Sequence, residues 1–273
     1  PMMRHFPAYD VLKVMMRGKG TAPAWWEPAG GISGYVRAML DELGGVDLRV
    51  STPVEEIRRE GASLVVSAGD TSERYDRVVV ATASGPAATL LQGVEGAGEL
   101  AEACAAFHSF PTTIAIHRDE EWMPESRGDW SAINVRIEGE TVWMTEWAGQ
   151  RQNRPVFRTW LPEGRPRPQD ILHEQSFEHL VVSPATPALQ RLIAEHQGDG
   201  GIYLAGMYVT DVDTHNSAVG SAVAVASHLA PGSPNLVRLA DHGGKVEMWR
   251  AWGAAGSPDQ GEAPSSSTKT ARS

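Results

Sequence analysis

The sequence contains almost no cysteine: Cys104 is the only one among 273 residues. A single thiol excludes an internal disulfide framework and any zinc cluster built on cysteines. Apolar runs are short as well, so no segment has the length of a membrane-spanning helix, and the first residues lack the apolar core of a signal peptide. These features favour a protein of a reducing compartment, and we expect it in the cytoplasm.

Positive charge is also scarce. The chain has 24 lysines and arginines against 34 acidic residues, which gives a net charge of −10. Because the basic residues do not gather into a block, nucleic acid and anionic membranes are not expected as partners. Hydrophobic residues make up 41% of the chain, enough for the core of one large domain or two small ones. A small-molecule substrate is the expected partner.

The first third of the chain alternates between helical and strand patterns. A helix is predicted where apolar residues recur at helical spacing, at Tyr35, Val36, Met39, Leu40 and Leu43, and Gly44-Gly45 ends it. Strands are predicted at residues 46–50, 63–68 and 74–82. The apolar run after Arg77 shows no polar alternation, which is typical of a strand buried on both faces.

The middle third is rich in the β-formers valine, isoleucine, threonine and tryptophan. Strands are predicted at residues 111–117, 130–137, 140–147 and 155–160. Short turns such as Glu138-Gly139 separate them, so we expect an antiparallel sheet. Residues 162–168, dense in proline and arginine, are expected to form a loop, and a helix at residues 187–196 leads to a strand at Gly201.

The most informative segment is residues 201–229. A short apolar strand ends in Ala205-Gly206, a polar loop follows, and a helix of very small residues begins at about Asn216. This order brings a tight backbone turn beside a helix N-terminus, which suits a large flat cofactor with an electron-rich edge. An ordinary buried helix of small residues is the alternative interpretation.

An earlier segment supports the cofactor. The chain reads Gly30-Gly-Ile-Ser-Gly-Tyr-Val-Arg-Ala-Met-Leu40, then Thr52-Pro-Val-Glu-Glu-Ile57, then Asp76-Arg-Val-Val-Val-Ala-Thr82. Together with residues 201–229, this order resembles the FAD-dependent amine oxidase and phytoene desaturase superfamily. Within it, the resemblance is to bacterial NAD/FAD-binding amine-oxidase-like proteins, over residues 25–240. The resemblance implies FAD as the cofactor and hydride transfer to its flavin as the chemistry.

The resemblance also implies which residues hold FAD. The valine of the Pro-Val element contacts adenine through its backbone, and this role falls to Val54. Negative charge develops at flavin N1 and the C2 carbonyl on reduction, so the N-terminus of the small-residue helix would stabilise the reduced ring. The implied cofactor-binding residues are Gly30, Gly31, Val54, Ala81, Thr82, Gly206, Met207, Asn216, Ser217 and Ala218.

Three departures separate the chain from a standard amine oxidase. No strand-linked G-x-G-x-x-G motif precedes Gly30 in this sequence, although that loop binds the FAD pyrophosphate. Met207 stands where relatives often carry an acidic residue. The strand at residues 111–117 contains no lysine to reach flavin N5 through water. We therefore expect part of a split or truncated flavoprotein, with a second chain as one possible source of the missing segment.

Other motifs are weaker. Gly96-Ala-Gly98-Glu-Leu-Ala101 matches G-x-G-x-x-A without a preceding strand, so a loop before a helix is expected. His173, Glu174, Glu178 and His179 lack the H-E-x-x-H spacing of a metal site and are interpreted as a solvated helical face. No metal is therefore expected. Gly31-Ile-Ser-Gly34 lacks one spacer residue of the G-x-S-x-G nucleophile motif.

Thr214 and His215 are the candidate catalytic residues, because they replace the aromatic residue that the resemblance implies just before the flavin helix. His215 can transfer protons near neutral pH, although a plain loop residue is the alternative.

The expected fold is α/β, with an incomplete Rossmann-like FAD-binding portion and a β-rich, mostly antiparallel substrate domain. The expected regions are an entry segment at residues 1–29, FAD-binding portions at 30–92 and 197–240, the β-rich domain at 93–196 and a disordered tail at 241–273. The expected activity is removal of hydride from a C–N or C–C bond. The alternatives are a double-bond isomerase and a binding subunit that holds no FAD by itself.

Overall fold

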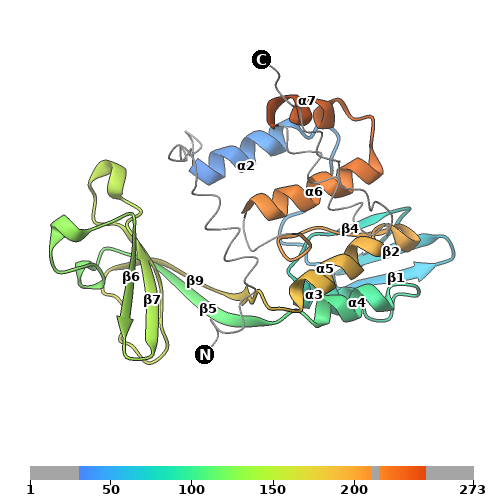
Figure 1. Ribbon diagram of the computed structural model, residues 1–273. Helices are drawn as coiled ribbons and strands as arrows, with labels where there is room; N and C mark the ends of the chain where they lie inside the picture. The colour runs from blue at the N-terminus through green and yellow to red at the C-terminus, as the bar shows by residue number, and fades with distance from the viewer. Residues whose placement is uncertain (1–30, 211–214, 244–273) are drawn as a thin grey trace, which may run out of the picture. The chain divides into compact units, whose positions relative to one another are not determined.

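The computed structural model describes residues 31–210 and 215–243 (Figure 1). The chain folds into two compact units. The second unit is one continuous segment, His108–Val181, and the first unit combines the described residues on either side of it. The β-rich domain was expected at residues 93–196, so the compact unit is shorter than that region at both ends. Helices and strands are mixed, and the sheets are mostly antiparallel, as predicted.

The first three strands of the first unit form an antiparallel sheet. It consists of β1 (Glu56–Glu60), β2 (Ser63–Ala68) and β3 (Thr71–Tyr75), in that order. Gly61 and Gly69 make the two tight turns with positive φ angles of 62° and 55°, which glycine adopts without a steric cost. Leu64 of β2 is fully buried. The strand predicted at residues 63–68 is confirmed.

The strand predicted at residues 74–82 is wrong, because the chain changes sheets within it. β3 ends at Tyr75, and β4 (Val78–Val80) pairs in parallel with β10 (Ile202–Leu204). β3 pairs with the antiparallel β2 in one sheet, whereas β4 pairs with the parallel β10 in another. Residues 74–82 are therefore divided between two strands. Burial on both faces is also wrong, since Val79 remains 42% exposed while Val80 is buried.

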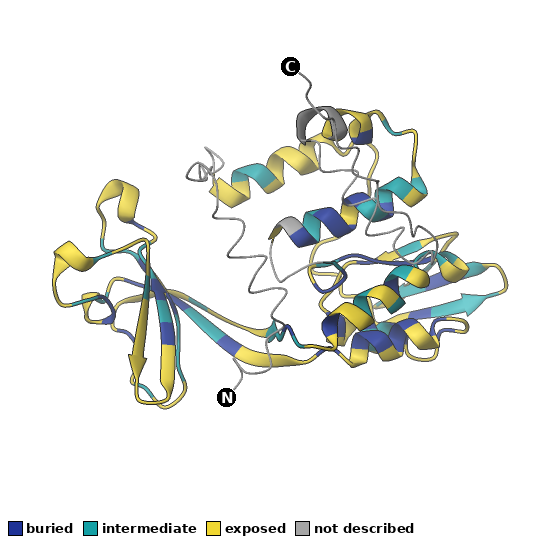
Figure 2. Cartoon of the chain, viewed as in Figure 1, coloured by how far each residue is buried: buried dark blue, intermediate teal, exposed yellow. Residues whose placement is uncertain are grey.

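Six described helices complete the first unit. Their bounds are α2 (Gly31–Glu42), α3 (Ser84–Leu91), α4 (Gly98–Ala105), α5 (Thr186–Glu195), α6 (His215–Leu229) and α7 (Pro234–Gly243). α4 packs against both α3 and α5, and Leu91, Leu100 and Ile193 from these three helices are fully buried. α2 contrasts with them, because none of its residues is buried (Figure 2). The helices predicted near Tyr35, at residues 187–196 and from Asn216 are confirmed.

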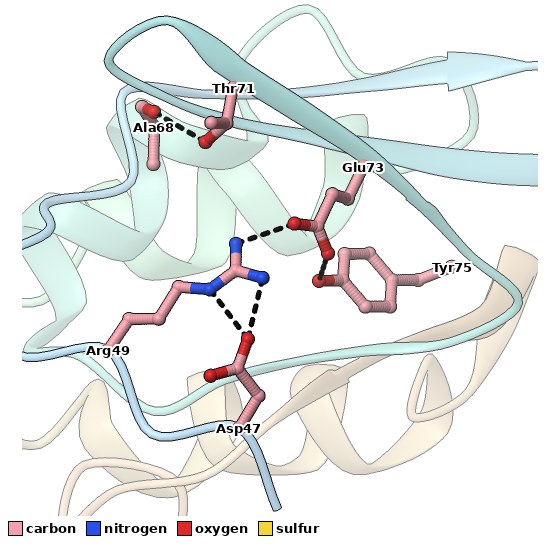
Figure 3. Close-up of polar contacts among 6 residues, drawn as sticks. All are labelled: Asp47, Arg49, Ala68, Thr71, Glu73 and Tyr75. Atoms are coloured by element: carbon pink, nitrogen blue, oxygen red, sulfur yellow. Dashed lines mark hydrogen bonds and ion pairs between the residues drawn. The ribbon is translucent and has the colours of Figure 1, made fainter.

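The strand predicted at residues 46–50 is also wrong. These residues form no ladder with a neighbouring strand, and side chains attach the segment instead (Figure 3). Arg49 binds Asp47 through its Nε, at 2.8 Å, and Glu73 of β3 through a terminal nitrogen, at 2.6 Å. Tyr75 donates a hydrogen bond of 2.8 Å to the same Glu73 carboxylate. The hydrogen bond from Arg49 lowers the pKa of Glu73.

The second unit is a five-stranded antiparallel sheet in the order β6-β7-β8-β5-β9. Its strands are β5 (Ser109–His117), β6 (Ile133–Glu138), β7 (Thr141–Glu146), β8 (Phe157–Trp160) and β9 (Ile171–Leu180). Gly139 begins the two-residue turn between β6 and β7 with a φ of 61°, which suits glycine at the first position of a type II′ turn. The predicted antiparallel sheet and the loop at residues 162–168 are confirmed.

The polar segment containing His173 and Glu178 is a strand, so its interpretation as a helical face is wrong. β9 is the edge strand beside β5, and most of its side chains are exposed on both faces. Polar residues on both faces remove the period-two pattern by which a strand is recognised. Short 3-10 turns fill several loops of the molecule: η2 (Glu120–Trp122), η3 (Arg127–Asp129), η4 (Gln150–Gln152) and η5 (Asp199–Gly201).

A chain of buried hydrogen bonds lies on the inner face of this sheet. His117 is fully buried, accepts the backbone N–H of Asp119 at its Nδ1 (3.2 Å), and contacts Thr159 Oγ1 through its Nε2 (2.8 Å). Thr159 in turn meets the hydroxyl of Thr145 at 2.9 Å. Because Nδ1 is an acceptor, the proton of this neutral ring belongs on Nε2. Burial lowers the pKa of His117.

Candidate functional site

The two parallel strands of the first unit end at the same edge, and this edge is the centre of the candidate site. Val80 closes β4 and Leu204 closes β10, and Ala205 N–H continues the pairing by donating to Val80 O at 3.1 Å. Thr82 and Gly206 follow directly. Ligands of open α/β sheets bind outside the carboxyl ends of their strands, so this edge is where a cofactor is expected.

Gly206 has a conformation that suits glycine alone. Its φ is 153°, and a Cβ built there would lie 2.9 Å from the Tyr208 ring and 3.6 Å from Thr82 O. The first distance is too short for a side chain, so the ring of Tyr208 occupies the space that a Cβ would need. Gly206 therefore lets the turn after β10 pass close to the end of β4.

Hydrogen bonds join this turn to α6. The Gly206 N–H donates to Ser221 Oγ at 2.8 Å, and Ser221 donates to Ala218 O at 2.7 Å. Thr210 Oγ1 donates to Ser217 O at 3.1 Å. Ser217 and Ser221 are almost completely buried, at 2% and 1% exposure. The end of β10 thus holds the first two turns of α6 in a fixed position.

His215 is the first residue of α6, and a residue from a distant part of the chain lies beside it. The rings of His215 and Tyr35 meet edge to face, with centroids 6.0 Å apart. Tyr35 belongs to α2, and His215 is exposed. An aromatic ring and an imidazole therefore stand together at the N-terminus of α6.

The family model for flavin containing amine oxidoreductases matches residues 4–152 of this chain. That match covers more than half of the 273 residues. The chain belongs to this family. Membership implies a flavin cofactor, and it confirms the resemblance that the sequence motifs indicated. α6 and β10 lie outside the matched residues, so the geometry described above is independent of that match.

The comparison with solved structures gives two matches. A fatty acid isomerase from P. acnes that produces CLA superposes with a TM-score of 0.56 at 14% identity, over 83% of this chain and 59% of the isomerase. A putative protoporphyrinogen oxidase from Exiguobacterium sp. 255-15 gives a TM-score of 0.46 at 15% identity, over 72% of this chain and 51% of the oxidase. The chain thus spans between half and three fifths of either structure. No curated protein matches it.

The residues at the strand edge fit the flavin that the family implies. The first turns of α6 carry only small side chains between Ser217 and Ser221, apart from Val219, so little bulk surrounds the helix start. The N-terminus of this 15-residue helix presents the positive end of the helix dipole. The Gly206 N–H is already bound to Ser221, so Gly206 contributes close approach instead of a hydrogen bond to a ligand.

The other predicted cofactor-binding residues occupy several parts of the first unit. Ala81 and Thr82 follow β4 and are exposed, and Met207 is 43% exposed in the turn after Gly206. Val54, 42% exposed, precedes β1 in the three-stranded sheet instead of the parallel pair.

Gly31 is the first residue of α2, with a φ of 67°, and Asn216 lies in the first turn of α6. Gly30 and Thr214 lie outside the described residues. The structure thus brings Thr82, Gly206 and the start of α6 together, while Val54 and Gly31 belong to other elements.

Two residues near the site have no signal in the sequence. Tyr208 is 2% exposed and stacks edge to face on Phe107 at 5.4 Å. Its hydroxyl faces the thiol of Cys104, and burial raises the pKa of this thiol to about 11. Tyr35 is the second such residue. Its place in the apolar pattern of α2 indicates only that it lies on one face of that helix. Contacts between distant segments cannot be read from local patterns.

No helix among residues 31–210 and 215–243 combines the length and the apolar character that crossing a bilayer requires.

Proposed function

We propose that this chain is the flavin-holding part of an FAD-dependent oxidoreductase that removes hydride from a C–N or C–C bond of a small organic substrate. The bound flavin would accept that hydride at N5 and pass the two electrons on to oxygen or another acceptor. The observation that carries the proposal is the attachment of α6 to the end of β10 through Gly206 and Ser221.

The residues of α6 would act on the electron-rich edge of the flavin. Their backbone N–H groups and the helix dipole favour negative charge at that edge, so they stabilise the reduced cofactor relative to the oxidised one. Ala218 and Gly220 keep the helix surface thin, and the fixed link between Ser221 and Gly206 prevents the helix start from moving away. Ala81, Thr82 and Val54 would bind the nucleotide end through their backbone groups.

His215 would accept the proton that the substrate releases as its hydride leaves. Its exposed ring stands at the N-terminus of α6, and an imidazole nitrogen can accept or donate a proton. Tyr35 would orient the ring through their edge-to-face contact.

One face of the five-stranded sheet exposes apolar side chains, and this face supports the proposal of an apolar substrate. Four side chains on β6 and β7 leave more than half of their surface exposed: Ile133, Val135, Ile137 and Val142. They share one face because successive residues of a strand alternate, and Val142 pairs with Ile137. β5, from Ser109 to His117, contains no lysine for amine chemistry.

This apolar face favours a double-bond isomerase as the second candidate. In such a reaction the hydride leaves the substrate and returns at another carbon, so no external acceptor is consumed. A hydrocarbon substrate suits the exposed isoleucines and valines better than a charged amine does. Product analysis in the absence of oxygen separates the two activities.

The chain could also fail to hold FAD by itself, since the sequence carries no strand-linked pyrophosphate loop. A strand-linked G-x-G-x-x-G segment, whichever polypeptide carries it, would supply the missing pyrophosphate contacts. Purified chain with the yellow absorbance of bound flavin supports the enzyme, and colourless chain that takes up no added FAD supports a binding subunit.

The test of the proposed mechanism is stopped-flow reduction of the flavin by a substrate that the holoenzyme turns over. His215→Ala should lower the rate of reduction by about 10²–10⁴-fold, the usual contribution of a general acid or base. Tyr35→Phe is the matched control, because it keeps the aromatic ring and should leave the rate close to wild type. A His215→Ala rate close to wild type would reduce His215 to a structural residue.

A further inference from the structure

The second unit contains a pocket of about 380 Å³ on the inner face of its sheet. Two tryptophans line it: Trp122 from η2 and Trp143 from β7, which are 7% and 3% exposed. Their rings meet edge to face, with centroids 6.0 Å apart. Trp143 points away from its neighbour Val142, because side chains alternate along a strand. The pocket therefore lies on the face opposite to the exposed apolar residues of β6 and β7.

A positively charged group already occupies the aromatic part of this pocket. The guanidinium of Arg165 lies 4.2 Å from the centre of the Trp143 ring and 5.2 Å from that of Trp122. Arg165 also forms an ion pair of 2.5 Å with Glu138. Two indole faces and a carboxylate around one cation are the arrangement by which proteins recognise organic cations.

The acidic groups of the pocket outnumber the basic groups that neutralise them. Glu121 and Glu163 line the pocket and form no ion pair within the described residues. Arg167, the other basic residue of the lining, is paired with Glu174 outside it. Asp119 accepts the backbone N–H groups of Glu121 and Gln169. The remaining charge of the pocket is negative even with Arg165 in place.

Arg165 lies in a loop, outside the strands of the sheet. Its neighbours Glu163, Gly164, Pro166 and Arg167 lie in the loop between β8 and β9, and its own side chain keeps 29% of its surface exposed. Trp122 and Trp143, by contrast, are held by strand and turn. The two tryptophans are thus more deeply buried than the arginine side chain that lies over them.

We propose that this pocket binds an organic cation, an alkylammonium or guanidinium group, and that Arg165 is its intramolecular occupant. When the ligand enters, its cationic group takes the place of Arg165 between the two indoles. Glu121 and Glu163 then compensate its charge. The aromatic surface favours an organic ion over a metal, and the described residues contain no group of three or more His, Cys, Asp and Glu that could hold a metal. The residues that carry this inference all belong to the second unit.

Calorimetric titration of the full chain with agmatine, which carries a guanidinium and an ammonium group, tests the proposal. Arg165→Ala should bind agmatine at least about tenfold more tightly than wild type. If Arg165 fills the pocket nine tenths of the time, the free pocket is one tenth populated, and the apparent dissociation constant rises by that factor. Glu121→Gln combined with Glu163→Gln should weaken binding to the Arg165→Ala variant.

Arg136→Ala is the matched control. Arg136 lies 5.6 Å from the same Trp143 ring and pairs with the same Glu138, but it does not line the pocket. This variant should bind agmatine as wild type does. Equal tightening in both variants, or none in Arg165→Ala, overturns the proposal. If Arg165→Ala loses its circular-dichroism spectrum, Arg165→Gln keeps the stem of the side chain, and the absence of tightening there is equally decisive.

Discussion

Gly206 and Tyr208 show how single residues determine the geometry of the candidate site. The ring of Tyr208 fills the position of the Cβ that Gly206 lacks, and the positive φ of Gly206 directs the chain past the end of β4. A glycine at a strand end can be recognised from the sequence alone. The tyrosine two residues later cannot, because its burial against Phe107 depends on a distant segment.

Replacing Gly206 by alanine should destabilise the first unit. The new Cβ would meet the Tyr208 ring at 2.9 Å and require an unfavourable φ, and each effect costs about 1–3 kcal/mol. Urea unfolding measures the loss. Gly85→Ala is the control, because Gly85 lies in α3 with no atom within 4 Å of a built Cβ, so alanine should be neutral or stabilising there. Equal stability of both variants would contradict this account.

His117 should make the second unit less stable in acid. Burial lowers its pKa in the folded protein from the ordinary 6.5, so the unfolded chain takes up its proton first. The neutral ring contributes its full stability above pH 6.5, and this contribution is lost as the pH falls toward the lowered folded pKa. In urea unfolding at several pH values, His117→Gln should show a smaller acid decline than wild type.

His196 provides a control of opposite sign. Its hydrogen bond to Asp199 raises its pKa, so its contribution is complete below pH 6.5 and is lost as the pH rises through the raised value. His196→Gln should therefore leave the acid decline unchanged. An acid decline of the same size in His117→Gln as in wild type would show that another group is responsible.

At the scale of elements, strong local signals in the sequence were sufficient to predict helices and strands. The helix at Tyr35 was predicted from apolar residues at helical spacing and the helix from Asn216 from its run of small residues. The sheet of the second unit was predicted from β-forming residues separated by short turns. β9 was missed because an edge strand with two exposed faces has no period-two pattern. Residues 46–50 show the opposite error. Val46, Leu48 and Val50 alternate as in a strand, but the segment forms no backbone ladder and is attached by the ion pair between Arg49 and Glu73.

The N-terminal part of α6 gives the prediction at this scale. Ala218→Leu adds bulk one turn into the helix, where the proposed flavin approaches, so FAD occupancy should fall. Overpacking of a close contact costs about 1–3 kcal/mol, or roughly a 5- to 150-fold loss of affinity. FAD titration followed by flavin fluorescence measures this loss. Ala226→Leu, farther along the same helix, is the control for a general effect on α6. Unchanged FAD binding in Ala218→Leu would show that α6 does not face the cofactor.

At the scale of the whole molecule, the sequence predicted the flavin family, because its turns and runs of small residues are local signals. It did not predict how the parts of the site meet. The contacts between Tyr35 and His215 and between Gly206 and Ser221 join separate elements of the chain. The pairing of β4 with β10, which creates the edge, joins Val78 to Ile202. Such contacts follow from packing, which a single sequence does not display.

The exposed apolar side chains of residues 32–50 lead to the last prediction. Eight of them keep at least two fifths of their surface exposed: Ile32, Val36, Met39, Leu40, Leu43, Val46, Leu48 and Val50. Exposed apolar side chains concentrated in one segment are typical of an interaction site. A strand followed by a G-x-G-x-x-G loop and a helix is apolar in its strand and would add the pyrophosphate-binding N–H groups.

We therefore expect the chain alone to bind less than one equivalent of FAD, and to approach one equivalent when it is co-expressed with such a segment. Native mass spectrometry measures both the complex and its flavin. Leu48→Lys should weaken association with the segment, because it places a charge within the apolar surface, whereas Asp70→Lys, in the exposed turn after β2, should not. One full equivalent of FAD bound by the chain alone would remove the need for such a segment.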